Sequence, residues 1–374
     1  MTLIALIITL VYISFIGSFI YGFEKVKPFH LIDVPAKTKF TVIIPFRNEA
    51  KHLPFLLKSI SELNYPKHLF EVIFVDDESN DSSVNLIKAF QLKSQIDSKL
   101  IGNTRQTNAP KKDAISTAIK IAKNEWIITT DADCIVPKYW LDTFDCFIEN
   151  HESNLIVAPV TYTNVKTFND RFQLLDFLSL QGTTIGSFGI KKPFLCNGAN
   201  LAYNISFFKL VHGFDGNTNV ASGDDIFLLE KAVKLAPNKV HYLKNFHATV
   251  TTFPEPDLKS LLSQRKRWAA KTSKYGSLFG KFTGISVLFM NALIICLLMI
   301  TLSGIVHPKI LAYTFIIKFG MDFLLLFKTV RFFNQEQYLH SFLFASLIYP
   351  FFSVFVAFSS VIKGFEWKGR KFRT

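Results

Sequence analysis

Two acidic residues at the end of an apolar run have the type and spacing that most directly predict chemistry in this sequence. The segment TTDADC places Asp131 and Asp133 two residues apart. In an extended chain the side chains at i and i+2 point to the same side, so both carboxylates could bind one cation. Carboxylate oxygens suit Mg²⁺ or Mn²⁺, whose remaining ligands are commonly substrate phosphates. Two acids in a turn are more often solvated or helix-capping residues, so the pair indicates a metal site only together with other residues.

Acidic residues follow two other apolar runs in the same way. In VDDESND, Asp76 and Asp77 could accept hydrogen bonds from a ligand, or could belong to a turn that caps the next helix. In PFRNEA, Pro45 shapes the loop, and Glu49 could reach a ribose hydroxyl or simply begin a helix. Each segment therefore has both a binding interpretation and a purely structural one.

Two more segments place charges at expected helix starts. APKKDAIS puts Lys111 and Lys112 where the helix dipole disfavours cations, which predicts an anion nearby, although a solvated pair fits equally well. SGDDIFLLE puts Asp224 and Asp225 at a helix N-terminus. Capping explains one acid. The second, Asp225, could act as a general base towards a substrate hydroxyl.

A cluster of cations surrounds one tryptophan, Trp268, in the segment LSQRKRWAAKTSK. The cations are Arg265, Lys266, Arg267, Lys271 and Lys274. Like charges this close repel one another, so an anion is expected beside them. Arg gives bidentate hydrogen bonds to phosphate oxygens, and the flat face of Trp268 suits a sugar ring. A membrane-surface helix that binds lipid headgroups is the alternative.

The order of apolar runs predicts the elements that position these residues. The strands FTVIIPF, EVIFVDD and EWIITTDAD are separated by helical stretches that include Leu53–Leu63 and Asp113–Ala122. Such alternation predicts an α/β fold with a mostly parallel central sheet, which binds ligands at the carboxyl ends of its strands. Further along, NLIVAPVTYT and NGANLAYN read as strands, and Asn169–Gly182, DDIFLLEKAVKLA and Leu258–Lys274 read as helices.

Four long apolar runs lie at the two ends of the 374-residue chain. Residues 2–23 carry no charge, and the other runs are Gly284–Val306, Ile310–Phe327 and Ser341–Ile362. About 20 apolar residues of helix span a bilayer core, so each run could be a membrane helix. In the third run Lys318 and Asp322 are spaced for pairing within the helix. In the last run Pro350 predicts a kink or a break.

Basic residues near the runs predict the orientation. Lys25 and Lys27 follow the first run, which places the N-terminus outside and residues 24–280 in the cytoplasm. The tail KGFEWKGRKFRT is also basic and should lie on the cytoplasmic side as well. One of the last three runs should therefore not cross the membrane, and the Pro350 segment is the candidate. The net charge of +13 fits this bias and attraction to anionic lipid better than nucleic-acid binding. The four cysteines lack metal-ligand spacing and fit a reducing compartment.

The segments IIPFRNEA, VDDESND, TTDADC, SGDDIFLLE and QRKRW occur in an order that resembles a known family. They are similar to those of membrane-bound inverting glycosyltransferases of family two, which have the nucleotide-sugar-binding GT-A fold. Membrane β-glycosyl synthases and ceramide-glucosyltransferase-like enzymes are the members they resemble. The resemblance covers roughly Phe40–Ser273 and the flanking membrane helices. It implies five parts: a membrane helix at 1–23, a linker at 24–38, the GT-A domain at 39–255, a basic interfacial helix at 256–280 and membrane or re-entrant helices with the tail at 281–374.

The resemblance also implies a role for each matching residue. The donor nucleotide would be bound by Pro45, Glu49, Asp76, Asp77, Lys111 and Asp131, and the metal by Asp131 and Asp133. The donor sugar would contact Asn197 and Gly198 of CNGAN, the diphosphate would contact Gln264 and Arg267, and the acceptor would contact Trp268. Asp225 would be the catalytic base, with Asp224 beside it. Two departures stand out. The base motif reads Gly-Asp-Asp where many relatives have Thr-Glu-Asp or Glu-Asp, and Pro110 precedes Lys111 where relatives often have Gly.

The expected activity follows from these roles. The protein would transfer a sugar from a nucleotide-sugar, expected to be a UDP-sugar, to a lipid or lipid-linked acceptor, with Mg²⁺ or Mn²⁺ and with inversion, to form a β-glycoside. It would be a multi-pass protein of the cell membrane whose catalytic domain faces the cytoplasm, with no nucleic-acid partner. Two alternatives stay open: a processive polysaccharide synthase that acts on a glycan, and a non-catalytic scaffold that only binds the nucleotide-sugar.

Overall fold

The computed structural model describes residues 2–218, 220, 222–272, 274–362, 365–367 and 370–372. Ser273, the expected end of the family resemblance, and much of the basic tail lie outside these residues. The chain divides into two compact units. We call Lys27–Thr163 with Cys196–Phe253 the sheet unit, and Met1–Val26 with Asn164–Leu195 and Pro254–Thr374 the helical unit.

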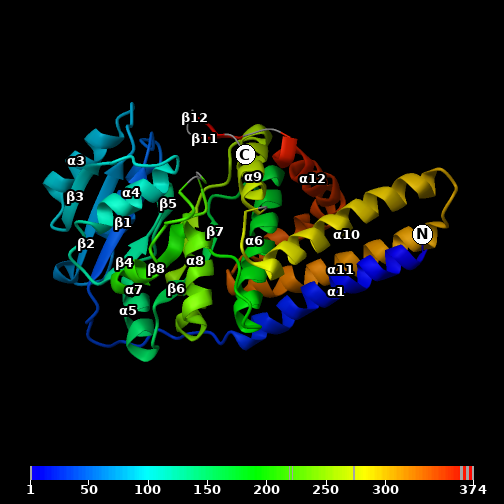
Figure 1. Ribbon diagram of the computed structural model, residues 1–374, viewed down its shortest axis with the longest axis horizontal. Helices are drawn as coiled ribbons and strands as arrows, with labels where there is room; N and C mark the ends of the chain where they lie inside the picture. The colour runs from blue at the N-terminus through cyan, green and yellow to red at the C-terminus, as the bar shows by residue number, and fades with distance from the viewer. Residues whose placement is uncertain are drawn as a thin grey trace. The chain divides into compact units, whose positions relative to one another are not determined.

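The sheet unit is built on a seven-stranded sheet of order β3-β2-β1-β4-β8-β6-β9 (Figure 1). Its strands are β1 (Phe40–Phe46), β2 (Phe70–Asp76), β3 (Asp97–Gly102), β4 (Trp126–Thr129), β6 (Leu155–Val157), β8 (Leu201–Asn204) and β9 (Val240–Tyr242). All neighbours pair in parallel except β8, which runs antiparallel to β4 and β6. The predicted α/β class with a mostly parallel sheet is confirmed.

The remaining elements of the sheet unit are short. The helices are α2 (Leu53–Ser61), α3 (Ser83–Lys93), α4 (Pro110–Ile119), α5 (Trp140–Asn150), α7 (Ile205–Leu210) and α8 (Asp224–Leu235), with 3₁₀ turns η1 (Lys67–Leu69), η2 (Gly198–Asn200), η3 (Pro237–Lys239) and η4 (Phe246–Ala248). A second sheet of order β5-β10-β7 contains Cys134–Ile135, Val250–Thr252 and Val160–Tyr162. The predicted strand NLIVAPVTYT is therefore two strands, β6 and β7, in different sheets, with Pro159 between them.

The helical unit contains the long apolar helices. Its elements are α1 (Thr2–Lys25), α6 (Phe168–Gly189), α9 (Leu258–Thr272), α10 (Leu278–Leu302), α11 (Pro308–Phe332), η5 (Glu336–Ser341), α12 (Phe342–Ile362), β11 (Phe365–Trp367) and β12 (Arg370–Phe372). Among the described residues, four helices are long and apolar enough to cross a membrane: α1, α10, α11 and the segment Glu336–Val361 that contains α12. These helices indicate membrane association. Helix α12 continues past Pro350, so the predicted break does not occur there.

Helix α6 packs on α1 in the helical unit, and glycines explain how it does so. A Cβ atom at Gly189 would lie 1.8 Å from the Gly22 carbonyl oxygen, and one at Gly186 would lie 2.4 Å from the Phe19 carbonyl oxygen. The two backbones thus approach in the manner of small-residue helix contacts. The sequence analysis placed this stretch inside 39–255, whereas the structure groups it with the first and last helices of the chain.

Candidate active site

The sheet topology brings the predicted donor-binding acids to one edge. Strands β1, β2 and β4 are parallel, with Phe46 opposite Asp76 and Ile43 opposite Thr129. Asp76 is the last residue of β2, and Asp131 follows the end of β4. Because parallel strands end on the same side, these acids lie at the carboxyl edge of the sheet, where ligands bind in open α/β folds.

Lys111 joins two of the predicted acidic segments. Its Nζ atom lies 2.6 Å from Asp131 Oδ1 and 3.3 Å from Asp224 Oδ2. Burial lowers the pKa of the Lys111 ammonium, but the carboxylates of Asp131, Asp224 and Asp225 raise it more, so the net pKa lies above its ordinary value and the group stays charged. The anions that a lysine at the start of α4 predicts are therefore Asp131 and Asp224.

The neighbouring Lys112 has a different role. It is buried, and its Nζ atom donates to the carbonyl oxygens of Asn217 at 2.7 Å and Val220 at 3.0 Å. The ammonium also lies 4.8 Å from the centre of the Phe227 ring. Lys112 thus ties α4 to the segment that leads into α8, and it is not a solvated residue.

The predicted base motif meets the predicted donor-sugar loop. The Gly198 amide donates to Asp225 Oδ2 at 3.1 Å, and the amide of Ile226 donates to Asp225 Oδ1 at 2.8 Å. A Cβ at Gly198 would lie 2.8 Å from Asp224 Oδ2 and 3.2 Å from Lys111 Nζ. A larger residue at 198 would therefore push against the charged cluster, and glycine allows the close approach.

Asn197 has a structural partner inside this loop. Its side-chain oxygen accepts from the Ala199 amide at 3.0 Å and so caps the 3₁₀ turn η2. The carbonyl of Gly198 accepts from Thr129 Oγ1 at 2.8 Å, which fixes the loop to the end of β4. The loop is thus held between β4 and α8, and its role at a donor sugar stays a prediction.

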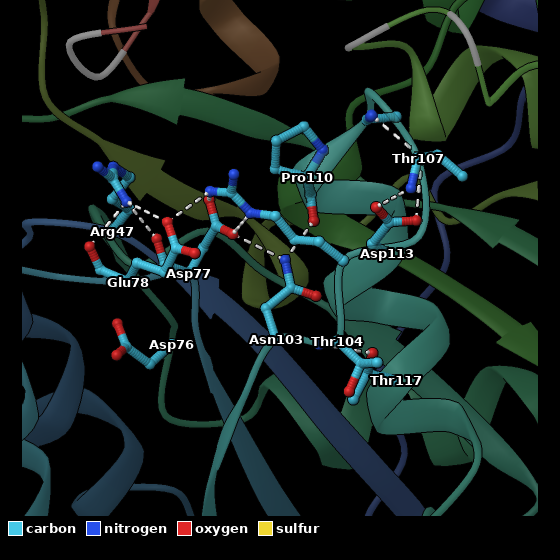
Figure 2. Close-up of polar contacts among 12 residues, drawn as sticks. Arg47, Asp76, Asp77, Glu78, Asn103, Thr104, Thr107, Pro110, Asp113 and Thr117 are labelled. Carbon is cyan, nitrogen blue, oxygen red and sulfur yellow. Dashed lines mark hydrogen bonds and ion pairs between the residues drawn. The ribbon is translucent and has the colours of Figure 1, made fainter.

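Asp77 is fixed by residues that the sequence analysis did not single out (Figure 2). Its carboxylate accepts from Asn103 Nδ2 at 2.8 Å and from Arg105 Nε and Nη2 at 2.8 and 3.0 Å. Arg47 donates to the carbonyl oxygens of Asp77 and Glu78 at 2.5 and 2.7 Å. The sequence did not indicate that Arg105 binds Asp77, because Arg105 follows β3, a half-exposed edge strand without an apolar run.

Asp76 and Glu49 are held by short local contacts. Asp76 Oδ1 accepts from the Ser79 amide at 2.9 Å, so this carboxylate forms the turn that was its alternative interpretation. Glu49 is buried, with Oε2 3.1 Å from His52 Nδ1, and its amide donates to Ser83 Oγ at 2.8 Å. Pro45 lies within β1, one residue before its end. These contacts bring the two loops after β1 and β2 together.

Comparison with known proteins identifies the family. Residues 41–211 match the family described as Glycosyl transferase family 2. The chain carries a glycosyl transferase family 2 domain. Glycosyltransferases among the similar proteins agree with this, so the matched segment is a glycosyltransferase domain.

Two relatives illustrate how far the similarity of this chain extends. The poly(ribitol-phosphate) β-N-acetylglucosaminyltransferase TarS of Staphylococcus aureus strain Mu50 is 30% identical over 127 residues, 34% of this chain and 22% of TarS. The poly-β-1,6-N-acetyl-D-glucosamine synthase of Staphylococcus epidermidis is 22% identical over 355 residues, 87% of this chain and 82% of the synthase. The match to TarS thus spans about a fifth of that protein, whereas the match to the synthase is almost end to end.

A solved structure confirms the predicted GT-A fold of the glycosyltransferase. The mannosyltransferase PcManGT from Pyrobaculum calidifontis, solved with GDP-Man and Mn²⁺, superposes with a TM-score of 0.58 at 16% identity. The superposition covers 92% of this chain and 98% of PcManGT. At this level of identity the likeness establishes the fold.

The acids of the glycosyltransferase domain suit a metal that shares its ligands with a substrate. Within the described residues, no group of three or more His, Cys, Asp or Glu side chains could hold a metal on its own. Asp131 and Asp133 supply two carboxylates directly after β4. Mg²⁺ is commonly bound by one or two carboxylates plus substrate phosphates, so this small donor set fits such a metal.

The three residues that the resemblance assigns to the diphosphate and the acceptor lie on α9, in the helical unit. Gln264 Nε2 donates to Glu255 Oε1 at 2.7 Å, and Trp268 lies 6.1 Å from Phe177, measured between ring centres. The roles of Gln264, Arg267 and Trp268 at a substrate stay predictions. Arg265, which the sequence analysis counted among the cations facing an anion, has a carboxylate partner in its own unit, Asp176.

Proposed function

We propose that this glycosyltransferase moves a sugar from a nucleotide-sugar donor, with a UDP-sugar as the first candidate, to a lipid or lipid-linked acceptor. The reaction is a single displacement that inverts the anomeric carbon, so an α-linked donor gives a β-glycoside. One observation carries the proposal: Asp131 and Asp224 both pair with Lys111, while Asp225 beside them is held by the Gly198 amide. Four separate sequence segments therefore meet at one charged cluster.

The donor's nucleotide would bind at the carboxyl edge of the sheet. Pro45, Glu49, Asp76 and Asp77 come from the ends of β1 and β2, and Asp131 comes from the end of β4. Asp131 and Asp133 would hold the divalent metal, Mg²⁺ or Mn²⁺. When bound, the metal supplies positive charge that stabilises the departing diphosphate. Lys111 adds a fixed positive charge beside the carboxylates at the same edge.

Asp225 is the proposed general base. It takes the proton from an acceptor hydroxyl, whose oxygen attacks the anomeric carbon from the face opposite the nucleotide. The bond from that carbon to the diphosphate oxygen breaks, and the nucleoside diphosphate leaves with the electron pair. The amides of Gly198 and Ile226 each bind one oxygen of Asp225 and so fix its orientation. Asp224 is bound to Lys111, and we assign it a positioning role.

The four candidate membrane helices support a reaction at a membrane. Lys25, the last residue of α1, and Lys27 favour a cytoplasmic location for the sheet unit at the cell membrane. A lipid or lipid-linked acceptor would suit this location, because its reacting end lies at the membrane surface.

Asp225→Asn tests the function. Membranes that contain the protein are supplied with UDP-N-acetylglucosamine, UDP-glucose and other nucleotide-sugars, and nucleotide release and product are measured with and without EDTA. We expect Asp225→Asn to bind the donor and to abolish transfer, and EDTA to stop turnover. Asp215→Asn, an exposed acid of the same unit, is the control and should behave as wild type. Substantial transfer by Asp225→Asn would remove it as the base, and turnover in EDTA would remove the metal assignment.

A processive polysaccharide synthase is the second candidate. The match to the poly-β-1,6-N-acetyl-D-glucosamine synthase over 87% of this chain favours it. The two candidates differ in product length, which a sizing gel of radiolabelled product measures: a ladder of long chains supports the synthase, and a single glycolipid supports the first proposal. A non-catalytic scaffold is disfavoured because each acid that the reaction needs is present.

A further inference from the structure

A buried arginine lies inside the QRKRW segment of α9. Arg265 is 5% exposed, and its Nε atom lies 2.6 Å from Oδ2 of Asp176 on α6, which is 8% exposed. The two charges are therefore removed from water together. Arg265 is not one of the residues that the family resemblance assigns to a substrate.

The Arg265 side chain contacts two residues that do have such an assignment. Its guanidinium lies 4.3 Å from the centre of the Trp268 ring, within cation–π range. Its Nη1 atom donates to the side-chain oxygen of Gln264. One planar group thus covers the indole face and holds the amide, while Phe177 lies beside the same indole.

Helix α6 holds this arrangement at a second point. Gln173, nearly one turn before Asp176, accepts from the Glu255 amide at 2.8 Å and donates to the Glu255 carbonyl at 3.0 Å. The Glu255 carboxylate in turn accepts from Gln264 at 2.7 Å. Glu255, three residues before the start of α9, and the middle of α9 are therefore both fixed to one face of α6.

Helix α12 packs on the same helix. The ring of Tyr349 on α12 lies 6.4 Å from the ring of Phe172 on α6, measured between ring centres, and Tyr349 interacts electrostatically with Asp176. The ammonium of Lys318 on α11 lies 5.6 Å from the centre of the Tyr349 ring. The contacts around Trp268 thus continue, through Asp176, to helices long and apolar enough to cross a membrane.

We propose that Asp176 and Arg265 are positioning residues for the acceptor side of the reaction, which rests on the function proposed above. The ion pair fixes the guanidinium, and the guanidinium fixes Trp268 and Gln264 in one orientation. A lysine could keep the charge but has no planar group to cover the indole, so Arg and Lys are not equivalent here. An ion pair that only stabilised the fold would make no such distinction.

Arg265→Lys is the main test, because it keeps a cation opposite Asp176. The first measurement is acrylamide quenching of Trp268 fluorescence in detergent. The chain has four tryptophans, so the Trp268 signal is obtained by subtracting the emission of the same protein with Trp268→Phe. We expect Trp268 to become more accessible to quencher in Arg265→Lys and in Asp176→Asn. Arg171→Lys is the control: Arg171 is an arginine of α6, and its Nε donates to Ser341 Oγ at 2.7 Å.

The second measurement is UDP release from UDP-N-acetylglucosamine by membranes, with acceptor and donor concentrations varied separately. We expect a higher acceptor KM and a kcat lowered by roughly ten- to a hundredfold, because displacements of about 1 Å have effects of that order. The donor KM should stay as in wild type, and Arg171→Lys should match wild type throughout.

The outcomes separate this proposal from the proposed function. If wild-type membranes release no UDP from this donor, that donor assignment fails, and the quenching measurement still decides the positioning role. If both Arg265→Lys and Asp176→Asn leave Trp268 quenching as in wild type, the positioning role is overturned. A lowered unfolding temperature with unchanged quenching and unchanged acceptor KM would likewise show a pair that only stabilises the fold.

Discussion

At the scale of single residues, the candidate active site holds one ammonium among several carboxylates. Lys111 Nζ lies 2.6 Å from Asp131 and 3.3 Å from Asp224, and Asp225, the residue after Asp224, adds a third negative charge. Without Lys111 these acids would repel one another and a diphosphate as well. With it, one carboxylate oxygen that could bind a metal is in contact with a cation of the protein.

Lys111→Met should therefore change two affinities in opposite directions. Binding of Mn²⁺ without nucleotide should tighten, because Asp131 loses its competing ammonium, and binding of UDP without metal should weaken by about tenfold or more, the effect of about 1.4 kcal/mol. Calorimetry or the electron paramagnetic resonance of free Mn²⁺ measures the first, and calorimetry the second. Lys111→Arg keeps the charge and is the control. A loss of Mn²⁺ affinity in Lys111→Met would contradict this account of the site.

The types and positions of the acids were enough to single them out as candidates, but their partners could not be read from the sequence. Asp131 follows the end of strand β4, and Asp225 lies in the first turn of helix α8. Both positions can be recognised in the local sequence pattern. Arg105 binds Asp77 from 28 positions away, across an edge strand that has no apolar run. Arg265 looked like one of several surface cations, and only the packing of α6 shows that it is buried.

At the scale of elements, the close contact of α6 with α1 depends on the absence of side chains. Gly186 and Gly189 face the backbone of α1 so closely that any Cβ would overlap it, whereas nothing lies within 4 Å of a Cβ built at Gly320 on α11. The same substitution at the two kinds of site should therefore have opposite consequences.

Gly186→Ala should lower the free energy of unfolding by about 1–3 kcal/mol through overpacking. Gly320→Ala should be neutral or stabilising by up to about 1 kcal/mol, because alanine favours helix. Thermal unfolding in detergent compares the two variants with wild type. Equal effects at the two sites would mean that α6 and α1 are not in backbone contact.

The N-terminus of α6 provides a pH-dependent test. Thr167 and Asp170 form a capping box, in which the Asp170 carboxylate accepts from the Thr167 amide at 2.8 Å and from the Lys166 amide at 3.0 Å. Partial burial raises the pKa of Asp170, but these hydrogen bonds lower it more, so the net pKa lies below its ordinary value of 3.8. The charged form is thus favoured in the folded state.

Asp170→Asn should accordingly be less stable than wild type at neutral pH, by about 0.5–1 kcal/mol, from the weaker cap and the lost charge at a helix start. The stabilisation by the charged form is present above the unfolded-state pKa and disappears as the pH falls through the folded-state pKa. The difference in unfolding temperature should therefore shrink below pH 3.8, the ordinary pKa of Asp. A difference that stayed constant with pH would argue against a role for the charge.

Element types were predictable where the apolar pattern is continuous, and they were missed where it is not. Buried strands such as β1 and β2 read clearly, since all but one residue of each is buried. Strand β3 is half-exposed, and α5 was not predicted although one face of it is buried. The glycines of α6 at 182, 186 and 189 have the i, i+4, i+7 spacing of one helix face, but this spacing does not indicate which helix lies opposite.

At the scale of the whole molecule, each unit is built from segments that are separated in the sequence. The helical unit takes its residues from the two ends of the chain and from Asn164–Leu195 in the middle. Composition identifies the apolar ends, but a contiguous division of the sequence cannot show that a moderately polar helix such as α6 belongs with them. The number of membrane crossings and the side on which the tail lies stay predictions from charge.

Inside the helical unit, a charged group links two of the apolar helices. Lys318 Nζ lies 2.6 Å from Asp322 on α11, as the spacing predicted, and the hydroxyl of Tyr12 on α1 donates to the same carboxylate. Lys318 is 2% exposed. A buried ion pair in an apolar surrounding contributes little net stability, but the loss of one partner leaves the other charge without compensation.

Single and combined substitutions should therefore have different effects on the stability of the protein. Asp322→Asn should destabilise the protein by about 3–5 kcal/mol, because it leaves the Lys318 ammonium without its counter-ion. Tyr12→Phe keeps the ion pair and should cost only about 1 kcal/mol, the value of one hydrogen bond. The triple variant Tyr12→Phe, Lys318→Met and Asp322→Leu replaces the whole group by apolar side chains and should be close to wild type or more stable. The unfolding temperature and the yield in membranes are measured for the three variants. A triple variant less stable than Asp322→Asn would show that the ion pair holds α1 against α11 in a way that apolar packing cannot replace.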